Sequence, residues 1–149
     1  MVYDSRKDKY QKAKSLIPLL RTTGSTPEGL TFEALEKLLV PATSDTDSYF
    51  VNISDGEPMF GYFTKSGSPV KNQNAYSGEQ AYEHTRKRVE EIRSRGIGVL
   101  SYFVSNSSRT TGKEADAFRK MYGKDARFIA INDIAQLSAT MNKKFLEKE

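Results

Sequence analysis

The chain of 149 residues lacks cysteine and tryptophan and has a single histidine, His84. Without cysteine it forms no disulfide and offers no thiolate to a metal or a substrate, which suits a reducing compartment. One histidine excludes a multi-histidine metal site, and any Ser-His-Asp triad would depend on His84. Because no nucleophile motif accompanies it, we expect a hydrogen-bonded or surface histidine rather than a catalytic base.

Long apolar runs and a segregated charge are also missing. No apolar run approaches the about 20 residues of a membrane span, and the first residues lack the apolar centre of a signal peptide. We therefore expect a cytoplasmic protein without a membrane partner. Acidic and basic residues alternate along most of the chain, whose net charge is +4, so nucleic acid is permitted but not indicated. The phosphate-binding loop Gly-x-x-x-x-Gly-Lys-Ser/Thr is absent, and no Gly-x-Gly-x-x-Gly follows a predicted strand.

An alternation of strand and helix patterns is present instead. Apolar runs predict strands at residues 49–54, 98–104 and 126–131, with a short strand at Met1–Tyr3. Helical patterns cover residues 6–20, 26–38, 78–95 and 113–122, and another begins after Asn132 or Asp133. The sequence thus predicts one domain over residues 1–149, a doubly wound, Rossmann-like α/β fold with a mainly parallel sheet between two helical layers.

Spacings of three and four predict the buried helix faces. Expected in the core are Tyr10, Ala13, Ile17, Leu20, Leu30, Ala34, Leu35, Leu38, Ala81, Val89, Ile92, Ala115, Phe118, Met121, Ile134, Leu137, Met141 and Phe145. Helix ends are predicted from Thr26 as an N-cap before Pro27, a capping box at Ser77–Gln80, and stops at Gly96 and Gly123.

The strand at 49–54 ends in Asp55-Gly56-Glu57-Pro58. Ligands of open α/β sheets bind beyond the carboxyl ends of the strands, and Asp55 is the first residue past this strand. Asp-Gly is also a common turn, so a structural role is equally open. Thr26 opens a helix at the same end of the sheet, and a hydroxyl with a carboxylate suits a hard cation such as Mg²⁺, although Thr26 can also serve only as a cap.

Two irregular stretches, residues 56–77 and 105–112, should lie at this same end of the sheet. The first of them is expected to form a small hairpin or flap from Phe60–Phe63 and Ser66–Pro69. Candidates for contact with a protein partner are Ser25, Glu57, Phe60 and Tyr62.

The order Gly24-Ser25-Thr26-Pro27-Glu28-Gly29, a helix, then Ile53-Ser54-Asp55-Gly56-Glu57-Pro58 resembles the von Willebrand factor A (vWA) domain, closest to the cobaltochelatase T-subunit type. That family has a metal-ion-dependent adhesion site (MIDAS) built from an Asp-x-Ser-x-Ser motif, a threonine loop and an aspartate loop. The resemblance implies that Thr26 approaches Mg²⁺ directly, and Asp55 directly or through water. It also implies a MoxR-type AAA+ ATPase as partner, with chelatase activity belonging to the assembly.

The Asp-x-Ser-x-Ser motif is absent, and only about 25 residues precede Thr26. We interpret the chain as the carboxyl-terminal part of such a domain without its first strands. Mg²⁺ binding is then expected to be weak or absent, because two hydroxyls and a carboxylate are missing. The strand at 49–54 would also keep an unpaired edge, which predicts self-association through that edge or an N-terminal segment folded back onto it.

The resulting functional hypothesis is a non-enzymatic protein-interaction domain with a remnant metal site. One alternative is an Mg²⁺-dependent hydrolase or phosphotransfer domain that uses Asp55 as nucleophile or metal ligand. Another is a basic nucleic-acid-binding module that uses the clusters at 86–88 and 143–144.

Overall fold

The computed structural model describes residues 7–21, 25–61, 76–105, 112–130 and 133–146. Within them, strands β1 (Tyr49–Ser54), β2 (Gly98–Ser105) and β3 (Ala126–Ala130) form a parallel sheet in the order β1-β2-β3. The strands predicted at 49–54, 98–104 and 126–131 are confirmed with small shifts at their ends. The predicted strand at Met1–Tyr3 lies outside the described residues.

The helices follow the predicted order. They are α1 (Tyr10–Leu16) continued by the 3₁₀ turn η1 (Ile17–Leu19), α2 (Glu28–Leu35) continued by η2 (Glu36–Leu38), α3 (Gly78–Ser94), α4 (Lys113–Tyr122) followed by η3 (Gly123–Asp125), and α5 (Ile134–Leu146). The stops at Gly96 and Gly123 are confirmed, because both glycines adopt a positive φ, 75° and 57°, just after a helix.

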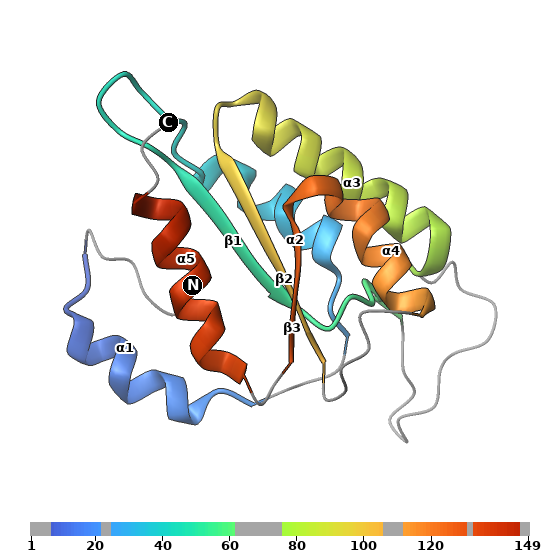
Figure 1. Ribbon diagram of the computed structural model, residues 1–149, viewed down its shortest axis with the longest axis horizontal. Helices are drawn as coiled ribbons and strands as arrows, with labels where there is room; N and C mark the ends of the chain where they lie inside the picture. The colour runs from blue at the N-terminus through green and yellow to red at the C-terminus, as the bar shows by residue number, and fades with distance from the viewer. Residues whose placement is uncertain (1–6, 22–24, 62–75, 106–111, 131–132, 147–149) are drawn as a thin grey trace.

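Helices lie on both faces of the sheet, with α2, α3 and α4 on one side and α5 on the other (Figure 1). The larger core cluster joins β1 and β2 to the first group through Phe32, Phe50, Val89, Ile92, Val99, Phe103, Phe118, Met121 and Tyr122. The smaller cluster is built from Leu100, Tyr102 and Ile129, with Leu137 and Met141 of α5 packed against it. The fold is therefore mixed α/β around a parallel sheet.

The predicted burial is confirmed for α3 and α4 but wrong for α2. Ala81, Val89, Ile92, Ala115, Phe118 and Met121 are all buried. In α2 the buried residues are Glu28, Gly29 and Phe32, while Leu30, Ala34 and Leu38 are exposed. The buried face of α2 therefore begins in the first turn of the helix. Of the residues predicted to be buried, only Leu35 packs against the core.

The two terminal helices also differ from expectation. In α1 and η1, Ala13 is buried, whereas Tyr10, Ile17 and Leu20 are 58–64% exposed. In α5, Leu137 and Met141 pack against the sheet, whereas Phe145 is 42% exposed. Its ring lies beside that of Tyr49, with the two ring centroids 4.9 Å apart. The side chain of Ile134 lies outside the described part of the chain.

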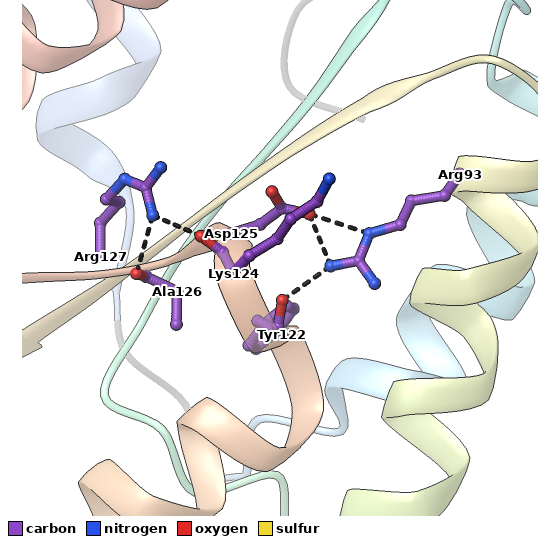
Figure 2. Close-up of polar contacts among 6 residues, drawn as sticks. All are labelled: Arg93, Tyr122, Lys124, Asp125, Ala126 and Arg127. Carbon is purple, nitrogen blue, oxygen red and sulfur yellow. Dashed lines mark hydrogen bonds and ion pairs between the residues drawn. The ribbon is translucent and has the colours of Figure 1, made fainter.

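The amino end of the sheet is fastened by an arginine of α3 (Figure 2). Arg93 donates from Nε to Asp125 Oδ2 over 2.8 Å and from Nη2 to the Tyr122 carbonyl over 2.7 Å. Arg95 donates to the carbonyl oxygens of Glu36 and Leu39, at 2.7 and 2.8 Å. These bonds connect the end of α3 to the turns that follow α4 and α2.

Helices α2 and α3 approach closely at Gly29. A Cβ atom added there would lie 2.3 Å from Tyr76 Oη, 2.8 Å from His84 Nδ1 and 3.0 Å from the Thr85 backbone nitrogen. No side chain fits in that space, so the contact depends on glycine.

Among the described residues, β1 pairs with β2 alone, so it is an outer strand of the sheet. Pairing of its other edge with a second chain stays a prediction. The described residues contain no helix that is long and apolar enough to cross a membrane.

Candidate functional site

The loops that carry Thr26 and Asp55 lie side by side at the carboxyl end of β1. The Met59 amide donates to the Thr26 carbonyl over 3.1 Å, and the Glu28 amide donates to the same oxygen over 2.9 Å. The predicted N-cap role of Thr26 is wrong, because Pro27 occupies the cap position and no side chain caps the helix. The exposed Thr26 hydroxyl is thus not used as a cap.

Asp55 is exposed and begins a turn. The Glu57 amide lies 3.5 Å from Asp55 Oδ1, and the Gly56 amide donates to Ser54 Oγ over 3.0 Å. Gly56 has a φ of 87°, and a Cβ there would lie 2.4 Å from the Phe103 ring, so the turn requires glycine. The turn role that the sequence left open for Asp55 is therefore observed, and it leaves the carboxylate accessible.

A buried polar cluster lies under this loop, and the sequence analysis missed it. Glu28, 3% exposed, accepts from Tyr122 Oη over 2.9 Å and is 3.4 Å from Asn52 Nδ2. Asn52 Nδ2 also donates to Tyr122 Oη over 2.9 Å. The cluster joins the first turn of α2 to β1 and to the end of α4. Its sequence signal was the pair of polar residues Asn52 and Ser54, two positions apart on one face of a buried strand.

Burial raises the pKa of the Glu28 carboxyl above its ordinary value of 4.5. Hydrogen bonds from Ser54, Tyr122 and Asn52 act in the opposite direction because they favour the charged form. The negative charge of Asp55 raises the pKa further, which also indicates that Asp55 lies near Glu28. The net effect favours the neutral acid at this position.

His84 is a hydrogen-bonded histidine, as predicted. Its Nδ1 lies 3.1 Å from Tyr76 Oη, and its Nε2 lies 3.5 Å from a Glu33 carboxylate oxygen. Burial raises the pKa of the Tyr76 phenol, so this tyrosine is not an activated nucleophile. Tyr76 also pairs through its backbone with Phe60, which brings residue 60 back to the start of α3.

Three carboxylates from separate segments lie around Tyr82 at this end of the sheet. Burial raises the pKa of the Tyr82 phenol, and three surrounding carboxylates raise it further. These are Glu57, Glu114 and Glu79, which come from the loop after β1 and from the first turns of α4 and α3. Ser77 is the N-cap residue of α3, but no side chain caps the helix, so the capping box predicted at Ser77–Gln80 is wrong. Glu79 instead pairs with Lys120 of α4.

Apolar side chains border the carboxylates. Met59 and Phe60 are each 43% exposed. Of the other predicted contact residues, Ser25 is half-buried and Glu57 is exposed, while Tyr62 and most of the expected hairpin lie outside the described residues. The surface combines negative charge with accessible apolar area, a composition that suits a protein contact.

The fit to a metal ion is partial. Thr26 and Asp55 supply hydroxyl and carboxylate oxygens of the kind that Mg²⁺ prefers. Within the described residues, however, no group of three or more histidine, cysteine, aspartate or glutamate side chains is arranged to hold a metal. Among the residues that the structure describes, Thr26 and Asp55 are therefore the two candidate ligands that the sequence analysis brings to this site.

A hollow of about 890 Å³ opens at the opposite, amino end of the sheet. Its lining includes Asp45, Asp47, Arg93, Lys124 and Asp125. Arg93 and Asp125 are paired with each other, so these two side chains connect elements of the fold at that end.

Searches against protein-family models, curated proteins and solved structures find no match to this chain.

Proposed function

We propose that this chain is a non-enzymatic protein-interaction domain whose contact surface is the carboxyl end of its sheet. The observation that carries the proposal is the accessible carboxylate of Asp55, held by a glycine-dependent turn beside the exposed side chains of Met59 and Phe60. Exposed apolar side chains can mark a contact surface, and neighbouring carboxylates add charge that a partner of opposite sign can complement.

The vWA resemblance gives this proposal its finer form. In that form Thr26 and Asp55 are the remnant of a metal-ion-dependent adhesion site, and the partner supplies a carboxylate to the same Mg²⁺. The paired Thr26 and Asp55 loops support it, since the Met59 amide and the Thr26 carbonyl bond these loops directly. A MoxR-type AAA+ ATPase in a chelatase-like assembly is the partner class that follows from the resemblance.

Binding of a purified MoxR-type ATPase from the same organism, measured with Mg²⁺ and with EDTA, tests the proposal. We expect Mg²⁺-dependent binding to the wild type, roughly tenfold weaker binding to Asp55→Ala and to Phe60→Ala, and little heat from Mg²⁺ alone in calorimetry. Asp45→Ala is the matched control, because Asp45 is exposed at the opposite end of β1. Equal binding by all four proteins would overturn the proposal.

The phosphotransfer alternative has less support, because Asp55 has no acidic companions arranged as a metal site in the described part of the chain. It predicts turnover of a phosphoester that Asp55→Asn abolishes. Such turnover, in the absence of any partner, would replace the interaction proposal.

A further inference from the structure

We infer that copies of this chain associate head to tail, with the basic segment of one copy, residues 7–21, docked on the carboxyl end of the sheet of the next. The inference rests on the proposed function, since it names an occupant for the same surface. Two surfaces of the chain carry the argument, and each has both a charge and an exposed apolar component.

The basic segment holds all of the net charge. Of the 23 lysines and arginines and 19 aspartates and glutamates, five and one respectively lie in residues 7–21, and the chain as a whole has a net charge of +4. The remaining residues therefore sum to zero. Lys12 pairs with Asp8 in this segment, whereas Lys7, Lys9, Lys14 and Arg21 form no ion pair with any described residue.

The same segment concentrates exposed apolar side chains. Tyr10, Ile17, Leu19 and Leu20 are between 58% and 69% exposed. Tyr10 belongs to the short helix α1, Ile17 and Leu19 to the 3₁₀ turn that continues it, and Leu20 follows in an extended conformation. These exposed side chains give the segment several apolar anchors for a contact with another chain.

The receiving surface has the opposite charge. Asp55, Glu57 and Glu114 are exposed at the carboxyl end of the sheet and form no ion pair within the described ranges. Met59 and Phe60 provide apolar area beside them. The two surfaces are present in every copy at equal concentration, and their charges and apolar areas complement each other.

This contact is favoured over pairing of the outer edges of β1. Two copies of β1 paired antiparallel would bring Asp45 and Asp47, before the strand, close to Asp55 and Glu57 of the other copy. Like charges at both ends of the pair oppose that arrangement. A contact between two different surfaces is heterologous, so it leaves one surface of each kind open at the ends of the assembly.

Sedimentation velocity over a range of protein concentrations is the first measurement. At about 50 mM salt the weight-average mass should rise above the 16.8 kDa of one chain as concentration increases. At about 500 mM salt, where charges are screened over a few ångströms, association should weaken roughly tenfold. A mass of one chain at every concentration in low salt would overturn the inference.

Two double variants then test the direction of the contact. Leu19→Ser with Leu20→Ser removes exposed apolar side chains from the basic segment. Asp55→Lys with Glu57→Lys reverses the sign of the charge on the receiving surface. All four side chains are exposed. Each variant alone should remain a single chain, with an unchanged circular dichroism spectrum. An equimolar mixture should form a complex that stops at two chains, because only one intact contact can form.

The matched control is Asp45→Lys with Asp47→Lys, which makes the same change of charge at the amino end of the sheet. It should self-associate as the wild type does. If it associates as weakly as the Asp55/Glu57 variant, net charge alone governs the effect and the inference fails. If neither double variant weakens association, the contact lies elsewhere, as in pairing through β1.

The outcomes separate this inference from the proposed function. If the chain is monomeric but binds the ATPase through Asp55, the proposed function stands and the self-association is refuted. If the chain self-associates head to tail but does not bind the ATPase, the self-association stands and the ATPase is excluded as the partner.

Discussion

The two ends of the parallel sheet are built differently. At the amino end, two arginines make hydrogen bonds within the fold: Arg93 donates to Asp125, and Arg95 donates to two backbone carbonyls. At the carboxyl end, Asp55 and Glu57 point to no cationic partner among the described residues, although a buried carboxyl, Glu28, lies directly beneath them. Arg93 and Arg95 at the amino end therefore hold helices together, whereas Asp55 and Glu57 at the carboxyl end stay accessible.

This contrast indicates a division between stability and binding. Charged groups that are half-buried and bonded contribute to stability, and their loss leaves a partner unsatisfied. Exposed carboxylates contribute little to stability, so Asp55 and Glu57 can serve an interaction without a cost to the fold. Mutations at the two ends should consequently separate unfolding free energy from partner binding.

The largest expected effect is at the amino end. Arg93→Ala removes the bonds to Asp125 and to the Tyr122 carbonyl and leaves Asp125, whose side chain is 19% exposed, without its partner. We expect the free energy of unfolding to fall by about 2 kcal/mol, measured by urea denaturation. Lys87→Ala, an exposed position on the same helix, is the control. A loss of less than about 0.5 kcal/mol would remove the contrast between the two ends.

A smaller effect is expected in the buried cluster under the carboxyl end. Tyr122→Phe removes the hydroxyl that donates to Glu28 and accepts from Asn52. The expected cost is about 1–2 kcal/mol in the free energy of unfolding. Tyr49→Phe is the matched control, because the Tyr49 hydroxyl makes no hydrogen bond within the described residues and should cost little.

This second prediction also has a pH dependence. The native pKa of Glu28 is raised above 4.5, so its contribution to stability is complete below that pH and is lost as pH rises through the native pKa. The Tyr122 hydroxyl favours the charged carboxylate. The cost of Tyr122→Phe should therefore be larger at about pH 8 than at about pH 5. Equal costs at both pH values would show that the hydroxyl acts independently of Glu28.

The smallest stability effect is expected at Asp55 and Glu57. Replacing each by alanine should change the free energy of unfolding by no more than about 0.5 kcal/mol, since both are exposed. The same variants should lose binding to a partner, so binding and stability are measured on one preparation. If the free energy of unfolding fell as much as in Arg93→Ala, the role of Asp55 would be to stabilise the turn rather than to bind a partner.

The sequence predicted the elements well because each has strong local periodicity. Ala81, Val89 and Ile92 repeat with the helical spacing, and their burial in α3 follows from it. The face of α2 was missed because leucines were given more weight than Glu28 and Gly29. Burial of a carboxyl depends on Tyr122, which is 94 residues away in the chain, and local patterns contain no such information.

The candidate site was predicted in part. The sequence placed Thr26 and Asp55 at one end of the sheet, and a backbone bond joins their loops there. It did not predict that Glu57, Glu79 and Glu114 surround Tyr82, because these residues come from three separate segments. The alternation of charges along most of the chain hid the excess of four positive charges in residues 7–21, and the exposure of the apolar side chains there required the fold.

The contact at Gly29 has a mechanical consequence. Since α2 and α3 touch where no Cβ fits, neither helix can slide along or rotate against the other without a collision or a gap. The Thr26 loop, which leads into α2, is thus mounted on a two-helix block rather than on a single helix.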